Sequence, residues 1–223
     1  MTDKDLFRVM RDKLFTAAVG DVLDVLGYRH QFLPQPIKPL LPDTKLAGRA
    51  MPVLEADYLE GEGHGPLSDQ PFGLMFAALD DLKEDEIYIA TGSSLEYALW
   101  GGLMSTRALH LKAVGAILDG YIRDTAEIRN LGFPAFSRGA FAQDQGVRGK
   151  VLDYRIPISI EGVRIEDGDL IFADDEGVLI IPKAVEQQAI SDALQKVRTE
   201  NDVAKAIRAG MSTQEAFATF GVM

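Results

Sequence analysis

The chain has 223 residues, a formal net charge of −11 and no cysteine. Its length suits one domain, or one domain with an added helical segment, and the missing cysteines exclude disulfides, thiolate nucleophiles and cysteine-ligated metals. The acidic balance and the scattered Lys and Arg residues argue against nucleic acid as a direct partner, and no apolar run approaches the roughly 20 residues that span a bilayer, so we expect no membrane partner either.

The first part of the chain is predicted to alternate helices with irregular segments. The charged N-terminus MTDKDLFRVM lacks the apolar core of a secretory signal, so we expect a cytoplasmic location. Residues 4–27 are predicted to be helical in two pieces, weakened at Gly20 and capped by Gly27. The segments that follow are predicted as an extended or looped stretch at 28–45, a strand at 46–56, a Gly- and Pro-rich loop at 61–72 and a helix at 73–82.

A β-α-β unit is predicted at residues 86–119. The strand DEIYIATG ends at Gly92, a helix covers 98–113, and VGAILDG is a short apolar strand of the kind that is buried in a parallel sheet. A right-handed crossover makes the two strands parallel, so the loops that follow them lie at the same edge of the sheet. That edge is where open α/β sheets bind ligands.

The remainder of the chain changes to short strands and then to a helix. FPAFSRG, VLDYRIPISI, GVRI, DLIFA and GVLIIP are predicted strands, and the turns at 166–168 and 174–177 favour hairpins. A helix is predicted from Lys183 to about Ala209, with Gly210 as its cap. We therefore predict a mixed α/β fold with a core domain at 1–182 and a C-terminal helical segment at 183–223.

Two loops of the β-α-β unit carry residues suited to binding an anion and a metal. The first loop places Gly101, Gly102, Leu103 and Met104 near a helix start, where free amides and the helix dipole attract anions. The second places Arg123, which can grip a carboxylate, beside Asp124, which can bind a hard cation. Together they suggest a small metal-bound carboxylate ligand. The alternative is structural, because glycine pairs before helices and Arg-Asp dipeptides are both common.

Three further features allow a functional or a structural interpretation. Glu200 lies on the apolar stripe of the C-terminal helix, where it either reaches water at the margin or serves the site of a neighbouring subunit. Asp174, Asp175 and Glu176 form either a hairpin turn or a metal site. His64, in the loop 61–72, either takes part in proton transfer or is simply solvated.

The segment WGGLMSTRALHLKAVGAILDGYIRDTAEIRNLGFPAFSRG (100–139), with its DGxxRD motif, resembles the RraA-like proteins, which include the 4-hydroxy-4-methyl-2-oxoglutarate aldolases. The resemblance continues through 163–182 and extends more weakly over GDVLDVLG (20–27), LAGRA (46–50) and RTEN (198–201). It implies a swivelling β/β/α sandwich fold. It also implies that the protein assembles as a homotrimer, or as a homohexamer made of two trimers, with active sites at the subunit interfaces.

The resemblance also implies roles for particular residues. Asp124 would bind a divalent metal, Mg²⁺ or Mn²⁺, and Arg123 would contact the 2-oxo acid. The amides after the glycines, those of Leu103 and Met104, would hold the substrate carboxylate. Glu200 of a neighbouring subunit would help to hold metal-bound water. The implied activity is that of a lyase: aldol cleavage, or oxaloacetate decarboxylation, through a pyruvate enolate.

One residue departs from the pattern. The aldolases usually carry an acid at the position of Gly102, where it orients metal-bound water, and glycine cannot do so. Either another residue substitutes, or the protein is a weak or different enzyme. The alternatives are a non-enzymatic regulator that binds a ribonuclease or another protein, as the RNase E regulators of the family do, and a different enolate-forming reaction such as dehydration or isomerisation.

Overall fold

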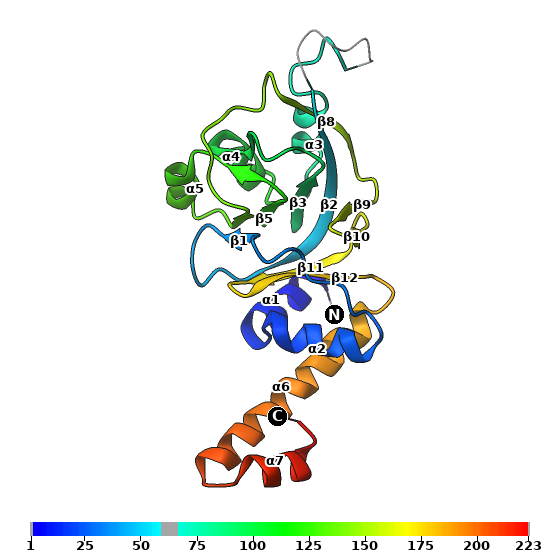
Figure 1. Cartoon of the computed structure of the whole chain (residues 1–223), viewed down its shortest axis with the longest axis vertical. Helices are drawn as coiled ribbons and strands as arrows, with labels where there is room; N and C mark the ends of the chain where they lie inside the picture. The colour runs from blue at the N-terminus through cyan, green and yellow to red at the C-terminus, as the bar shows by residue number, and fades with distance from the viewer. Residues whose placement is uncertain (1, 59–66, 223) are drawn as a thin grey trace.

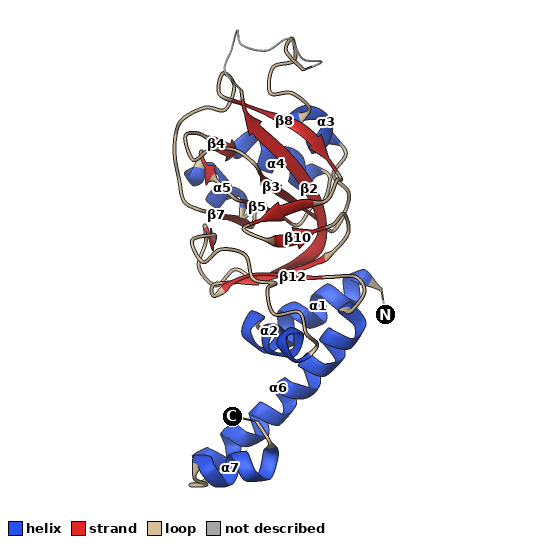
Figure 2. Cartoon of the chain, turned by 45° about the vertical axis from the view of Figure 1, so that its right-hand side comes forward, coloured by secondary structure: helices blue, strands red, loops and turns tan. Residues whose placement is uncertain are grey.

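A strongly bent, mixed β-sheet organises the chain, with helices on its two outer sides (Figure 1, Figure 2). The computed structural model describes residues 2–58 and 67–222. The predicted mixed α/β class and the C-terminal helical segment are confirmed. Within those two ranges, no helix has both the length and the apolar character needed to cross a membrane.

The helices are α1 (Asp3–Lys13), α2 (Thr16–Val25), α3 (Met75–Asp80), α4 (Gly102–His110), α5 (Thr125–Leu131), α6 (Glu186–Arg208) and α7 (Thr213–Phe220). The strands are β1 (Lys38–Pro39), β2 (Leu46–Asp57), β3 (Glu86–Thr91), β4 (Ala98–Trp100), β5 (Gly115–Leu118), β6 (Tyr121–Ile122), β7 (Ala135–Ser137), β8 (Gly149–Tyr154), β9 (Ile158–Ile160), β10 (Val163–Ile165), β11 (Leu170–Asp174) and β12 (Gly177–Ile181).

The long strand β2 joins the parallel and antiparallel parts of the main sheet. The strand order is β1-β7-β5-β3-β2-β11-β12, and β8 also pairs with β2. One edge of β2 pairs in parallel with β3, while its first residues pair with β11 and its last with β8, both antiparallel. Because three strands pair with it, β2 fixes the position of the β3–α4–β5 unit relative to the C-terminal half of the sheet.

Both faces of the sheet are buried, which explains its continuous apolar runs. Ile87 and Ile89 of β3 face a cluster that includes the β9–β10 hairpin, whereas Tyr88 and Ala90 face the side covered by α3, α4 and α5. A third cluster lies between the β11–β12 hairpin and helices α1, α2 and α6. The ends of the parallel strands therefore lie next to the helical layer of α3, α4 and α5. Helix α6 packs in the other helical layer, with α1 and α2.

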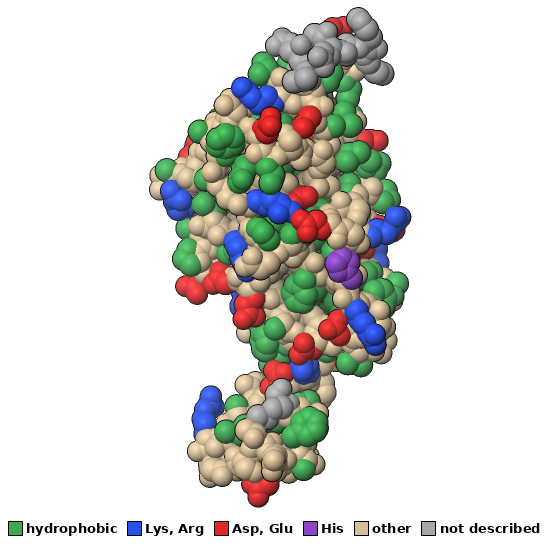
Figure 3. Space-filling view, in the orientation of Figure 1, with side chains coloured by type: hydrophobic (Ala, Val, Ile, Leu, Met, Phe, Trp, Pro, Cys, Tyr) green, Lys and Arg blue, Asp and Glu red, His purple; other side chains and the backbone are tan. Residues whose placement is uncertain are grey.

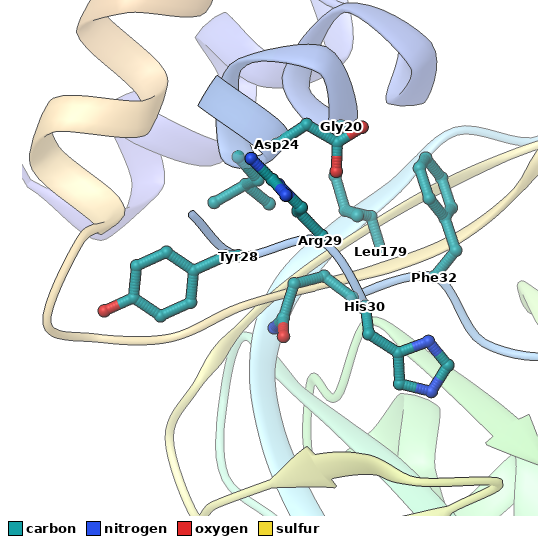
Figure 4. A pocket seen from close by; sticks show the side chains of 9 residues that line it. Gly20, Asp24, Tyr28, Arg29, His30, Phe32 and Leu179 are labelled. Atoms are coloured by element: carbon teal, nitrogen blue, oxygen red, sulfur yellow. The ribbon is translucent and has the colours of Figure 1, made fainter. Parts of the chain in front are cut away.

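The α2 helix is attached to the sheet by a buried carboxylate and a close aromatic contact. Asp174, at the end of β11, accepts hydrogen bonds from the Thr16 amide (2.8 Å) and the Thr16 hydroxyl (2.7 Å), so it caps the start of α2. Gly20 is a glycine because a Cβ there would lie 2.4 Å from Cε2 of Phe32, whose ring rises beside the helix (Figure 4). The acids at 174–176 form the predicted hairpin turn.

Several predicted boundaries are wrong, each for a tertiary reason. The N-terminal helix is in two pieces, as predicted, but it breaks between α1 and α2 rather than at Gly20. The helix predicted at 98–113 begins only at 102, because residues 98–100 pair with β6. The turn at 166–168 does not join a hairpin, since β10 pairs with β9 and β11 pairs with β2 and β12. The helices α5 and α7 were not predicted.

Asp174→Ala is expected to lower the free energy of unfolding by about 2–3 kcal/mol, because it leaves the buried donors of Thr16 without their charged acceptor. Glu176→Ala is the matched control: it removes an exposed carboxylate from the same turn and is expected to change stability by less than about 0.5 kcal/mol. Urea denaturation of the two variants measures the difference. Equal losses would show that Asp174 does not hold α2.

Candidate functional site

The two loops of the predicted β-α-β unit do meet at one edge of the sheet. β3 and β5 are parallel neighbours, with Ile87 opposite Gly115. Beyond their ends, the short strands β4 and β6 pair in parallel, and the Trp100 carbonyl accepts a hydrogen bond from the Arg123 amide at 2.9 Å. This contact brings the start of α4 beside the start of α5. The structure thus places Gly101 to Met104 next to Arg123 and Asp124, as predicted.

The Asp124 side chain connects the two helix starts. Asp124 precedes α5 in the left-handed conformation (φ 56°), which Asp adopts more readily than most residues. Its side chain does not cap its own helix. Instead, Oδ2 accepts a hydrogen bond from the Gly102 amide of α4 at 3.1 Å. Oδ1 has no hydrogen-bond partner in the described part of the chain, so it is available to a ligand.

Arg123 is held between two carboxylates. Its Nη1 donates to Asp144 Oδ1 at 2.6 Å, and its Nε lies 3.8 Å from Asp124 Oδ2. Asp144 is itself oriented by the Gly146 amide at 2.9 Å. The Asp-Gln-Gly sequence at 144–146 predicts a turn, but nothing in it indicates proximity to Arg123. Sequence analysis therefore missed Asp144, which fixes the direction of the guanidinium.

A cavity of about 300 Å³ opens in front of these groups. Its polar wall is formed by Arg123, Asp124, Asp144 and Gln145, and the α4 start contributes Gly101, Leu103 and Met104. Its remaining wall is apolar and consists of Phe72, Met75, Phe76, Leu79, Ala98, Leu99 and Trp100. Among the described residues, none accepts a hydrogen bond from the amide of Leu103 or Met104. The helix start thus offers two free donors to an anion.

The glycine pair before and in α4 allows two carboxylates to approach closely. A Cβ at Gly101 would lie 2.7 Å from Asp124 Oδ2, and a Cβ at Gly102 would lie 2.1 Å from Glu127 Oε2. Both distances are far shorter than real contacts, so neither position accepts a side chain while Asp124 and Glu127 keep these conformations. A side chain at position 102 and the observed conformation of Glu127, in the first turn of α5, therefore exclude each other.

A buried acid lies behind the cavity. Glu55 of β2 is 1% exposed, and its Oε2 accepts a hydrogen bond from Gln145 Nε2 at 2.7 Å. Its Oε1 has no partner among the described residues. Burial away from water raises the pKa of Glu55 to about 8, because the charged form loses its hydration. Glu55 is therefore protonated at neutral pH, and it holds Gln145 in the cavity wall.

The donor set suits a hydrated Mg²⁺ or Mn²⁺ better than a closed metal cage. In the two described ranges of the chain, no group of three or more His, Cys, Asp or Glu side chains could hold a metal ion. Mg²⁺ commonly keeps several waters and binds through one or two carboxylates together with substrate oxygens. Asp124, with one free oxygen beside an anion-binding helix start, fits that mode.

Other predicted residues are not brought to this cavity. Glu200 is part of α6, which leaves the body on the far side of the β11–β12 hairpin (Figure 1). Its carboxylate lies 3.2 Å from Lys196 Nζ, and Lys196 also pairs with Asp21. His64 lies outside the described residues. Over the face drawn in Figure 3, Lys and Arg side chains are dispersed among acidic ones.

Comparison with known proteins gives relatives over most of the chain. A family model described as RraA-like, Aldolase/RraA, matches residues 16–180. The chain is 31% identical over 202 residues to protein DlpA of Legionella pneumophila, covering 90% of this chain but 31% of DlpA, so it spans about a third of that protein. It is 30% identical over 181 residues to a Halalkalibacterium halodurans protein provisionally named a 4-hydroxy-4-methyl-2-oxoglutarate aldolase, covering 81% of this chain and 79% of that one.

A solved structure supports the fold. The Streptomyces coelicolor protein RraAS2, described as an unusual member of the RNase ES inhibitor RraA protein family, matches with a TM-score of 0.77 at 22% identity. The match covers 90% of this chain and 96% of that one. At this level of identity, the likeness establishes the shared architecture.

The buried acid gives a pH prediction. The folded pKa of Glu55 lies above the ordinary value of 4.5, so the folded state retains a proton that the unfolded chain loses between about pH 4.5 and 8. Stability from this group is complete below pH 4.5 and falls by about 1.4 kcal/mol per pH unit across that window. The Glu55→Gln variant has no carboxyl group at this position and so does not lose stability in this way. The free energy of unfolding of the variant minus that of the native protein should therefore increase as pH rises from 5 to 8.

Urea denaturation at several pH values measures the effect, and the comparison cancels the other titrating groups that the two proteins share. Glu96→Gln, at an exposed position, serves as the control and should show a flat difference. A flat difference for Glu55→Gln as well would show that the Glu55 pKa is not raised by burial.

Proposed function

The chain belongs to the RraA-like family, and from this premise we propose that it is a divalent-metal-dependent carbon–carbon lyase acting on a 2-oxo acid. The observation that carries the proposal is the convergence of Arg123, the free oxygen of Asp124 and the unpaired amides at the start of α4 on one cavity. The relative from Halalkalibacterium halodurans, by its name, supports a lyase.

The start of α4 and Arg123 would bind the acid end of the substrate. The Leu103 and Met104 amides point out of the first turn of α4, where the helix dipole favours negative charge. Arg123 already makes one short contact to Asp144, which limits its rotation and directs the rest of the guanidinium to the cavity. A carboxylate on the amides would leave the neighbouring 2-oxo group beside Arg123 and Asp124.

The proposed chemistry breaks the carbon–carbon bond next to the pyruvyl unit. The electron pair of that bond moves toward the 2-oxo group, giving the enolate of pyruvate and either a carbonyl compound in aldol cleavage or CO₂ in oxaloacetate decarboxylation. In aldol cleavage the substrate hydroxyl group also loses its proton to solvent, and in both reactions the enolate carbon takes up a proton from water to give pyruvate. A bound divalent cation supplies Lewis-acid stabilisation of the enolate oxygen. Arg123 contributes a fixed positive charge at the same oxygen, which needs no reorganisation during the reaction. Asp124 would hold the cation.

The apolar wall of the cavity limits which groups a substrate can carry beyond its pyruvyl unit. Arg123 is the only cationic side chain among the described residues that line the cavity. A substrate with one carboxylate on the amides of the α4 start, its 2-oxo group beside Arg123 and an apolar remainder against Phe72 and Phe76 fits this wall.

A second candidate function is regulation of another protein without catalysis. The specific observation in its favour is Gly102, which provides no acid at a position where the aldolases usually carry one. RraAS2, whose fold this chain shares, belongs to a family described as RNase ES inhibitors. Metal binding distinguishes the two, because a regulator of this kind does not need Asp124 as a ligand. A different enolate-forming reaction, such as dehydration, uses the same site, and a panel of hydroxy- and oxo-acids would separate it from cleavage.

Asp124→Asn is expected to abolish Mn²⁺ binding measured by calorimetry and to lower the release of pyruvate from oxaloacetate by at least about 100-fold. Asp153→Asn is the control, since Asp153 is exposed on β8 and accepts only from the neighbouring Tyr154 amide. The reaction is followed by coupling pyruvate to a reporter enzyme, with free metal as the blank. If the native protein releases no more pyruvate than free metal and binds no Mn²⁺, the lyase proposal is wrong.

We also propose that the protein assembles as a trimer or hexamer, in which Glu200 serves the site of a neighbour. The support is geometric: Glu200 sits on α6, whose C-terminal part and α7 extend away from the body, while the cavity lies by α4 and α5 (Figure 1). Light scattering at micromolar concentration should give a trimer or a hexamer.

Co-expression of Asp124→Asn and Glu200→Gln chains tests the sharing of sites. Mixed assemblies combine an intact Asp124 from one chain with an intact Glu200 from another, so they should recover part of the activity that each variant alone lacks. A monomer by light scattering, or no recovery in verified mixed assemblies, would contradict the shared site.

A further inference from the structure

Two aromatic rings, those of Phe72 and Phe76, stand in the apolar wall of the candidate cavity. Their ring centroids lie 5.6 Å apart and their planes are inclined at 67°, which is the edge-to-face arrangement that aromatic side chains favour. Phe76 is the second residue of α3 and is 56% exposed, although it lines the cavity. This aromatic pair therefore leaves apolar surface open to a ligand.

The backbone of Phe72 adopts a conformation that is unusual for a bulky residue. Its φ of 61° lies in the left-handed region, and its carbonyl accepts hydrogen bonds from the Val151 amide at 3.1 Å and the Met75 amide at 3.3 Å. A Cβ at Gly146 would lie 3.4 Å from two carbons of the Phe72 ring, so the ring packs beside the turn that carries Asp144. Strained conformations of this kind are concentrated at ligand sites, which makes the placement of this ring a candidate functional feature.

The charges of the cavity suit a ligand with one carboxylate. Among the described residues that line it, one arginine and two aspartates are charged, so these side chains carry one net negative charge. The remaining polar side chain, Gln145, already donates a hydrogen bond to Glu55. The segment 59–66, which precedes the aromatic pair in the chain, contains neither Lys nor Arg.

A divalent cation and one substrate carboxylate would together bring the charge of this lining to zero. A second carboxylate, placed against the aromatic pair, would lose hydration without gaining a hydrogen-bond donor or a positive charge from the described residues of the wall. An apolar group in the same place loses no hydrogen bonds, and its burial against the rings is favourable. The wall therefore favours an apolar group over an acid at the far end of the substrate.

We propose that Phe72 and Phe76 make the site selective for 4-hydroxy-2-oxo acids that have a single carboxylate and a flat apolar group on C4. This inference rests on the proposed function, because it uses the carbon–carbon cleavage assigned there. In such an acid the bond between C3 and C4 breaks and its electron pair passes to the enolate of pyruvate. The C4 hydroxyl loses its proton to solvent and becomes the carbonyl of an apolar aldehyde or ketone, and the enolate carbon takes up a proton from water.

A panel of three substrates tests this selectivity, with pyruvate release in the presence of Mn²⁺ as the measurement. The three are 4-hydroxy-2-oxo-4-phenylbutanoate, 4-hydroxy-2-oxopentanoate and 4-hydroxy-4-methyl-2-oxoglutarate, which carry respectively a phenyl group, a methyl group and a second carboxylate beyond the cleaved bond. We expect kcat/KM for the phenyl compound to exceed that for each of the others by at least about 10-fold. Oxaloacetate is the reference, because its second carboxylate leaves as CO₂.

Substitutions of Phe76 test whether the aromatic pair causes the selectivity. Phe76→Ala is expected to lower kcat/KM for the phenyl compound by about 10-fold and to leave the methyl compound nearly unchanged, because only the larger group reaches the ring. Phe217→Ala is the matched control, since Phe217 is 57% exposed on α7, and it should change neither value. Phe76→Arg supplies a positive charge at the same place and should shift the preference toward the dicarboxylic substrate.

Thermal melting and light scattering show whether the variants keep the fold and the assembly of the native protein. If the native protein cleaves the dicarboxylic substrate as efficiently as the phenyl compound, the selectivity is refuted and the lyase stands. If folded Phe76→Ala lowers kcat/KM equally for all three substrates, or changes the assembly, Phe76 does not read the substrate and the inference is wrong. If neither oxaloacetate nor any of the three releases pyruvate above free metal, the proposed function itself is refuted.

Discussion

The parallel pairing of β3 with β5 is the constraint on which the candidate site depends. A parallel pair requires a crossover, here through α4, and the crossover returns the chain to the same edge of the sheet. The pairing of β4 with β6 extends this arrangement, and the contact between the Trp100 carbonyl and the Arg123 amide fixes its spacing. A hydrogen bond thereby joins two segments that are more than twenty residues apart in sequence.

Electrostatic balance at the site comes from separate elements. Arg123 Nη1 donates its hydrogen bond to Asp144, whereas its Nε lies 3.8 Å from Asp124 Oδ2, beyond hydrogen-bond distance. The Gly102 amide takes one oxygen of Asp124 and leaves the other free. Glu55, buried and protonated behind Gln145, supports the cavity wall without adding a negative charge to it. The site thus combines a free carboxylate oxygen, an arginine held by its ion pair with Asp144 and two free amides.

Residue patterns predicted much of this organisation, but some elements and site residues were predicted wrongly or missed. The β-α-β unit, the convergence of Arg123 and Asp124 with the α4 start, and the 174–177 hairpin were predicted correctly, because each depends on local periodicity or on the handedness of a crossover. The start of α4 was placed four residues early, since Ala98–Trp100 form a strand only when β6 is present to pair with them. Asp144 and Gln145 were missed because their roles depend on contacts with distant strands and loops.

The amino-acid sequence by itself determined the fold class, the family resemblance and the identity of the central pair Arg123 and Asp124, because these follow from short-range patterns and from one specific motif. It also showed that Gly102 departs from the pattern, but it left open what that departure means. Only the tertiary structure shows that a Cβ at position 102 would collide with the Glu127 carboxylate, because this contact is made between two helices and no spacing along the chain reveals the direction of a side chain across such a gap.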